Sequence, residues 1–208
     1  FHDDAVLTDC EDVSPEAVAA WRQTGMAHDA APVPQRPQER QAWMRFKSQT
    51  LTRFTLDLRQ AVQAIRGPQV KTARNLFSLP ILEPQSEAWF AQNLDDFLAA
   101  YDWTVPMAMP LMESVPIDAS QAWLTRLVQA VARHPGALKK TIFELQARDW
   151  NRRQQNAIPD QQLADWMRLL RLNGVKNYGY YPDDFINNQP DISRIRPQFS
   201  SWWYPDHD

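Results

Sequence analysis

Apolar residues recur along the chain at two spacings, one typical of helices and the other typical of buried strands. Ser14-Pro15 predicts the start of a short helix, because Ser caps helices and Pro fits the first helical position. A much longer helix follows, and Gly67-Pro68 is expected to end it. The apolar stripe of this long helix comprises Trp43, Phe46, Leu51, Phe54, Leu58, Val62 and Ile65. The predicted helices span residues 14–25, 39–65, 86–101, 119–134 and 160–172.

Short apolar segments separate these helices and predict strands. The segment 103–112 is apolar almost throughout, which is typical of a strand buried on both faces. Residues 27–38 contain three prolines and predict an extended loop, and no clear element is predicted from Pro182 onward. The predicted strands span residues 70–79, 103–112, 140–146 and 175–181.

Strands that alternate with helices predict an α/β fold with parallel strands joined by right-handed crossovers. Both a doubly wound sheet and a (β/α)8 TIM-like barrel have this order. No Gly-rich phosphate loop follows any strand, and polar and aromatic residues gather after strand ends, where barrels place their active sites. We therefore favour the barrel. With Phe1 at the end of a strand the chain holds about five strands, so it is expected to be only the C-terminal part of a barrel of eight.

Composition narrows the functional class. The 208 residues are enough for a single domain, taken here as 1–208, and the formal net charge of −3 argues against a nucleic-acid partner. Cys10 is the one cysteine of the chain, so the chain has no internal disulfide. Nine tryptophans are either core residues or platforms on which sugar rings stack. Trp43, Trp123 and Trp166 lie on helical stripes and are expected in the core, whereas Trp202 and Trp203 are ambiguous.

An acidic pair, Asp3-Asp4, stands at the predicted strand end. When two carboxyl groups lie close together, the pKa of one of them is raised, which suits a general acid. Glycoside hydrolysis uses two carboxyl groups, or one carboxyl group together with a group of the substrate. Glu113, at the end of the apolar segment, is the candidate for a second carboxylate, and Glu144 lies within a strand and faces either way. The alternative for Asp3-Asp4 is a structural cap of the following loop.

A metal site is not predicted, although His2 and Asp4 share a face if the segment is extended. The other three histidines lack ligand spacing, so His2 is expected to be a hydrogen-bonding residue of the barrel rim, and no cofactor is expected. Esterase chemistry has no support, because the chain lacks the G-x-S-x-G elbow.

Substrate-binding residues are expected near the strand ends. Trp89 and Trp150 are placed to line a groove on the rim. Tyr181 is at the end of the last predicted strand, and Asp183 and Asp184 follow it. Carboxylates there pair with ammonium groups of a cationic ligand, and an indole face attracts both a sugar ring and a cation. The alternative for Asp183-Asp184 is a solvated turn.

Four segments carry a resemblance to a known family: FHDDA, SEAWFAQNLDDFLAAYDWTVPMAMPLMESV, KTIFELQARDWN and GVKNYGYYPDDFINNQPDISRIRPQFSSWWYP. Together they resemble the C-terminal domain of the bacterial poly-β-1,6-N-acetyl-D-glucosamine N-deacetylases, which act in the export of a biofilm exopolysaccharide. The resemblance covers essentially the whole chain.

The resemblance implies a (β/α)-barrel that binds the partly deacetylated polymer and, in related members, cleaves it. It implies that Asp3 or Asp4 carries this cleavage and that Trp89 and Trp150 line the groove. It also implies a periplasmic lipoprotein attached to the outer membrane, with a metal-dependent deacetylase domain at the N-terminus. That domain and the first barrel strands are absent from this chain.

Three hypotheses remain open at this point. The chain is an endo-acting glycoside hydrolase domain, or a non-catalytic module that guides the polymer to an outer-membrane porin, or a fragment that needs the missing strands. In the last case an unpaired sheet edge would drive association.

Overall fold

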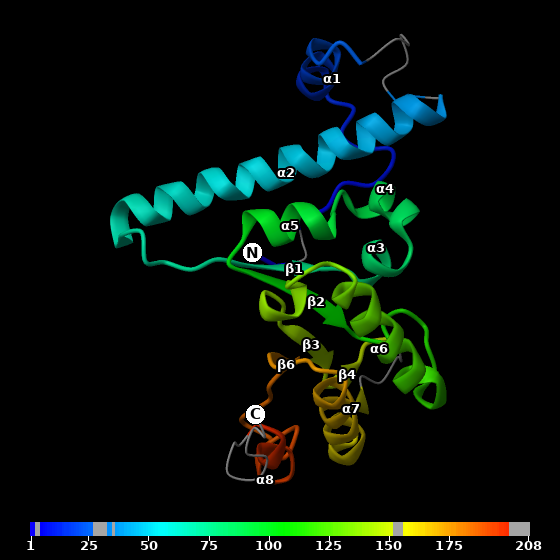
Figure 1. Cartoon of the computed structure of the whole chain (residues 1–208), viewed down its shortest axis with the longest axis vertical. Coiled ribbons are helices and arrows are strands. Elements are labelled where there is room, and N and C mark those ends of the chain that lie inside the picture. Colours follow the sequence, from blue (N-terminus) through cyan, green and yellow to red (C-terminus); the bar gives the residue numbers. More distant parts are fainter. Residues whose placement is uncertain (3–4, 27–32, 35, 152–155, 200–208) are drawn as a thin grey trace. The chain divides into compact units, whose positions relative to one another are not determined.

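The computed structural model describes residues 1–208 with the exception of 3–4, 27–32, 35, 152–155 and 200–208. The described residues form two compact units, residues 1–104 (unit 1) and 105–208 (unit 2), and the boundary falls within strand β2 (Trp103–Ala108). Helices and strands alternate along the chain (Figure 1).

Unit 1 begins with helices α1 (Pro15–Gln23) and α2 (Pro37–Arg66), close to the predicted spans. Ser14 caps α1 as expected, because its hydroxyl accepts a hydrogen bond from Ala17 N. α2 is the long cyan helix of Figure 1, and it ends at Gly67 with φ of 87°, a conformation that favours glycine.

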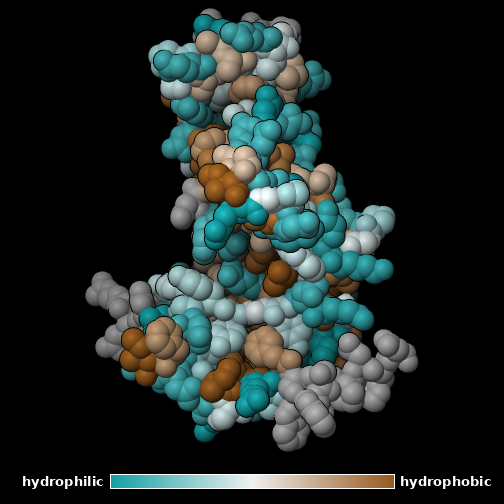
Figure 2. Space-filling model, turned by 90° about the vertical axis from the view of Figure 1, so that its left-hand side faces the viewer, coloured by the Kyte–Doolittle hydropathy of each residue, from teal (hydrophilic) through white to brown (hydrophobic). Residues whose placement is uncertain are grey.

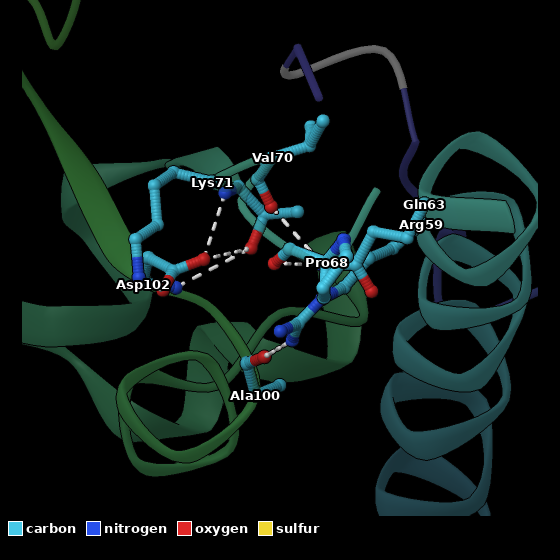
Figure 3. A network of polar contacts seen from close by, with 8 residues as sticks. Arg59, Gln63, Pro68, Val70, Lys71, Ala100 and Asp102 are labelled. Atoms are coloured by element: carbon cyan, nitrogen blue, oxygen red, sulfur yellow. Dashed lines mark hydrogen bonds and ion pairs between the residues drawn. The ribbon is translucent and has the colours of Figure 1, made fainter. Parts of the chain in front are cut away.

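The second half of α2 is anchored through polar groups. Arg59 donates to the carbonyl of Ala100, and Gln63 donates to the carbonyls of Pro68 and Val70. Figure 3 shows both side chains reaching from α2 to this backbone, next to an ion pair between Lys71 and Asp102.

The predicted apolar stripe of α2 is buried only at its start. Trp43 is 3% exposed, but Phe54, Leu58, Val62 and Ile65 are exposed. On the face drawn in Figure 2, exposed hydrophobic surface lies in patches between hydrophilic residues. The prediction of one continuous core-facing stripe is therefore wrong for the second half of the helix, where Thr52, Thr55 and hydrogen-bonding side chains face inward.

The segment that follows α2 differs from its prediction. The strand predicted over 70–79 is shorter, and the helix predicted over 86–101 is broken at Ala91, whose φ of 51° is left-handed. The observed elements are β1 (Ala73–Leu76), α3 (Ser78–Leu82), the 3-10 helix η1 (Pro84–Ser86), α4 (Glu87–Phe90) and α5 (Leu94–Ala100). Asn93 caps α5 by accepting a hydrogen bond from Asp96 N.

Phe1 lies beside β1 in a parallel arrangement. Its amino group donates to Ala73 O at 2.8 Å, and Asn75 N donates to Phe1 O at 3.0 Å. These two bonds, one on each side of Arg74, are the pattern of a parallel ladder. Residue 1 belongs to none of the described strands, so the expectation that the chain starts at a strand end stays a prediction.

Unit 2 contains parallel strands. β3 (Phe143–Gln146) pairs with β2 on one side and with β6 (Tyr178–Tyr181) on the other, with Ala108 opposite Leu145 and Gln146 opposite Tyr181. A short antiparallel pair, β4 (Arg148–Asp149) and β5 (Asn156–Ala157), follows β3 and was not predicted. The predicted strands 103–112, 140–146 and 175–181 all exist but are shorter, since β2 ends at Ala108, β3 begins at Phe143 and β6 begins at Tyr178. A 3-10 helix, η2 (Ala137–Lys139), precedes β3.

Helices α6 (Ile117–Ala132) and α7 (Asp160–Leu172) complete the core of unit 2. Trp166 on α7 is fully buried and donates its indole N–H to the Ser120 hydroxyl on α6 at 2.8 Å. Trp123 is also buried, so all three tryptophans assigned to the core lie there. The tail, predicted without a clear element, contains α8 (Ile192–Ile195) and the 3-10 helix η3 (Arg196–Gln198).

Candidate functional site

Three loops of unit 2 carry candidate residues. Because β2, β3 and β6 run parallel, the loops after their carboxyl ends start at the same edge of the sheet. Glu113 lies in the loop after β2, Trp150 directly follows β4 in the loop after β3, and Tyr181 is the last residue of β6. These three predicted site residues therefore lie on loops that share one edge.

Two aromatic residues meet at this edge. The rings of Trp150 and Tyr181 are stacked, with centroids 6.1 Å apart and planes inclined by 22°. Tyr181 is 49% exposed and Trp150 is partly exposed. Flat aromatic faces at an accessible edge suit the apolar CH faces of a pyranose ring.

The two neighbouring carboxylates after β6 differ in their surroundings. Asp184 accepts hydrogen bonds from the side chain and backbone of Asn187, which lower the pKa of its carboxyl group, and it forms an ion pair of 3.7 Å with Arg148. Its backbone pairs with Gln189 across a tight loop. Asp184 therefore holds the loop together.

Asp183, by contrast, is exposed. Its carboxylate accepts a hydrogen bond of 3.1 Å from the Tyr180 hydroxyl. Burial and this hydrogen bond raise the pKa of Tyr180, so that side chain stays a donor. Asp183 is thus the carboxylate of the pair that is available to a cationic ligand.

The loop that carries Glu113 is held by a buried amide. Gln146, which is fully buried, accepts hydrogen bonds from the backbone N–H groups of Leu111 and Met112 and donates to Arg148 O. Asn151 donates to Leu111 O from the other loop. The loops after β2 and β3 are therefore joined by side-chain hydrogen bonds, and sequence reasoning missed these residues. The signal available was the polar Gln at the end of the apolar segment KTIFELQ.

Unit 1 carries the other candidates. His2 is exposed and directly follows Phe1, which pairs with β1, while Trp89 on α4 is 47% exposed. Leu7 N donates to Phe90 O, so the segment after the acidic motif lies beside the end of α4. Asp3 and Asp4 lie outside the described residues, and their proposed role stays a prediction.

A cavity of about 580 Å³ in unit 1 contains none of the predicted site residues. Arg45 on its wall forms ion pairs with Asp96 at 3.2 Å and with Glu87 at 4.0 Å, and burial raises the pKa of Glu87. Arg45, Asp96 and Glu87 on this wall therefore pair with one another.

No three His, Cys, Asp or Glu side chains converge as a possible metal site among the described residues. Of the helices that the structure describes, none is both long and apolar enough to cross a membrane.

Known proteins match both the sequence and this architecture. Residues 1–181 match the family described as GHL13, hypothetical glycosyl hydrolase family 13. The glycoside hydrolase domain of PgaB (BpsB) from Bordetella bronchiseptica has a TM-score of 0.89 and 45% identity, over 96% of this chain and 56% of that chain. The fold is thus an α/β fold of the TIM-barrel type, although the described strands do not close a barrel.

The chain belongs to the GHL13 family of glycoside hydrolase-like domains. More particularly, it is 54% identical over its whole length to the poly-β-1,6-N-acetyl-D-glucosamine N-deacetylases of Escherichia coli K12 and O157:H7. It spans 31% of the length of these curated relatives. The resemblance found in the sequence is therefore confirmed.

Proposed function

We propose that this domain binds partly deacetylated poly-β-1,6-N-acetyl-D-glucosamine and hydrolyses it internally. The observation that carries the proposal is the close similarity to a glycoside hydrolase domain, at 45% identity and a TM-score of 0.89. The polymer is proposed from the names of the relatives, which are poly-β-1,6-N-acetyl-D-glucosamine N-deacetylases.

The described residues of unit 2 support binding of such a polymer. Deacetylated units carry ammonium groups, and Asp183 offers an exposed carboxylate for a charge-assisted hydrogen bond. The Trp150–Tyr181 stack offers aromatic surface to the sugar rings. His2 and Trp89 of unit 1 are proposed as further substrate-binding residues, and Asp184 holds the loop that carries Asp183.

The proposed reaction starts at the acidic pair. One carboxylic acid, Asp3 or Asp4, gives its proton to the glycosidic oxygen while the bond from that oxygen to the anomeric carbon breaks. Water then adds to the anomeric carbon and loses its proton to a carboxylate. Glu113 is proposed as the second carboxylate, or a group of the substrate assists in its place.

In the complete protein, we propose that this domain works with an N-terminal deacetylase domain and the remaining barrel strands. A periplasmic location with a lipid anchor in the outer membrane, and transfer of the polymer to an export porin, are part of the same proposal. No cofactor is proposed for this domain.

The test separates cleavage from binding. The complete protein and its Asp3→Asn and Asp4→Asn variants are incubated with the partly deacetylated polymer, and the products are measured by mass spectrometry. Loss of short oligosaccharides in one variant, with affinity for the polymer within about tenfold of the parent, supports a hydrolase and identifies its acid. Equal cleavage by all three proteins would contradict the assignment of the acidic pair. A parent that binds without cleaving would leave the alternative, a non-catalytic module that guides the polymer.

A further inference from the structure

The parallel register of unit 2 determines which way Glu144 faces. Residues directly opposite each other on neighbouring strands point to the same face of a sheet. Glu144 on β3 lies opposite Met107 on β2 and Gly179 on β6, and two positions further along Gln146 lies opposite Tyr181. These five positions therefore share one face of the sheet.

The opposite face of these strands is covered by other parts of unit 2. It carries Phe143 and Leu145, which are fully buried, and α7 contacts β3. On β6, the ring of Tyr180 contacts that of Phe199, with centroids 6.1 Å apart. In a barrel of the TIM type, helices cover the outer face of the sheet and the inner face surrounds the barrel axis. The face that carries Glu144 is therefore the inner one.

The two neighbours of Glu144 on this face differ in size. Glu144 is half-buried, and the side chain of Met107 on one side of it is buried. On the other side, no atom of the described residues lies within 4 Å of the position that a Cβ on Gly179 would take. Gly179 does not have a positive φ, so its backbone conformation does not require glycine. A glycine within a strand often marks a place where a ligand approaches closely, and Gly179 leaves such a gap beside Glu144.

This gap lies next to the aromatic surface at the end of the strands. Tyr181 follows Gly179 by two positions on the same face and stacks with Trp150. Two positions along a parallel strand correspond to about 6.6 Å. A glucosamine ring carries its amino group at its edge, whereas aromatic residues contact its CH face. A ring held on Trp150 and Tyr181 can therefore direct its amino group towards Glu144.

We propose that Glu144 and the gap over Gly179 form a subsite for the ammonium group of one deacetylated glucosamine unit. The inference rests on the proposed function, and it names the group of the polymer that this part of the domain selects. A carboxylate accepts charge-assisted hydrogen bonds from an ammonium group, and a half-buried pair is screened by solvent less than an exposed one. An N-acetyl group is uncharged and larger, so the same subsite discriminates against acetylated units.

The test uses two variants of the complete protein and one control. Glu144→Gln removes the charge and keeps the shape of the side chain, and Gly179→Ala places a methyl group in the gap. The control, Asp118→Asn, removes an exposed carboxylate at the start of α6. Binding is measured by calorimetry with short β-1,6-linked oligosaccharides of glucosamine and of N-acetylglucosamine, and thermal unfolding is measured for each variant.

Glu144→Gln is expected to weaken binding of the glucosamine oligosaccharide about tenfold and to leave binding of the acetylated one within about twofold of the parent. Gly179→Ala is expected to weaken binding of the glucosamine oligosaccharide by a similar factor. Its thermal stability should equal or exceed that of the parent, because alanine lowers the entropy of the unfolded chain at a position with an ordinary φ. Asp118→Asn should bind both oligosaccharides as the parent does.

Parent-like affinity of Glu144→Gln for the glucosamine oligosaccharide would overturn the inference, whether or not Gly179→Ala folds. An equal loss for both oligosaccharides would also contradict it, because the carboxylate would then contact a group that the two sugars share. Parent-like binding by folded Gly179→Ala would mean that no ligand occupies the gap. These three results leave the proposed function intact, whereas a parent that binds neither oligosaccharide would overturn the proposed function together with the inference.

Discussion

Trp150 and Tyr181 lie with their ring centroids 6.1 Å apart and their planes inclined by only 22°, although 31 positions separate them along the chain. The contact follows from the parallel register of β3 and β6, which places Tyr181 opposite Gln146, four positions before Trp150. Two separate loops thereby contribute to one aromatic surface.

Replacing Trp150 with Ala should weaken polymer binding about tenfold, because the variant loses a stacking surface that contributes about 1 kcal/mol or more. Trp150→Phe should retain most of the affinity, since it keeps a flat ring. Binding is measured by calorimetry with partly deacetylated oligosaccharides. The control is Phe54→Ala, which removes an exposed ring on α2 that has no proposed role. Equal affinities for Trp150→Ala and the parent would exclude this surface from the binding site.

Replacing Gln146 with Ala should reduce the free energy of unfolding by about 2–4 kcal/mol, because the N–H groups of Leu111 and Met112 lose their buried acceptor. Urea denaturation measures the change. Gln129→Ala, at an exposed position of α6, is the matched control and should change stability by less than about 0.5 kcal/mol. A loss of similar size in both variants would mean that the amide does not hold the loop.

The ionisation of Asp102 should make the stability of the protein depend on pH in the acidic range. Hydrogen bonds from Thr72, chiefly from its backbone N–H, lower the pKa of Asp102 to about 2 from an ordinary value of 3.8. Because the folded-state pKa is the lower one, the stabilisation is complete above pH 4 or so and is lost as the pH falls towards about 2. Asp102→Asn should therefore be less stable than the parent at pH 7, and the difference should shrink below about pH 4. Thermal unfolding across this range tests it, and a constant difference would contradict the assignment.

Asp183→Asn should weaken binding of the deacetylated polymer about threefold at low salt, since an exposed ion pair contributes less than about 1 kcal/mol. The effect should vanish at high salt, where such pairs are screened. The control is Asp165→Asn, which removes a partly exposed carboxylate on α7 that pairs with Arg168. A salt-independent loss for Asp183→Asn would indicate a structural change in the loop instead of lost charge pairing.

The sequence predicted the long regular elements well. The span 160–172 is the span of α7, and α2 and α6 lie within about two residues of their predictions, because helical periodicity and Pro or Gly signals mark these segments clearly. The break at Ala91 was missed, since a left-handed alanine leaves no local signal and is imposed by tertiary structure.

The candidate site was predicted in part. The sequence identified Trp150 and Tyr181 from their places after strands, and the structure brings them together. It could not separate Asp183 from Asp184, because their roles depend on Asn187, Arg148 and Tyr180, which are positioned by the folded loop. Gln146 was missed for the same reason: periodicity predicts burial of apolar residues, and gives no sign of a buried polar group that bonds to a distant backbone.

The most direct test of the account is cleavage of two polymers that differ only in acetylation. The complete protein, with the proposed deacetylase domain inactivated, is incubated with fully acetylated and with partly deacetylated poly-β-1,6-N-acetyl-D-glucosamine, and the products are identified by mass spectrometry. Short oligosaccharides are expected from the partly deacetylated polymer alone. Both polymers remaining intact, with the partly deacetylated one still bound, would contradict hydrolysis.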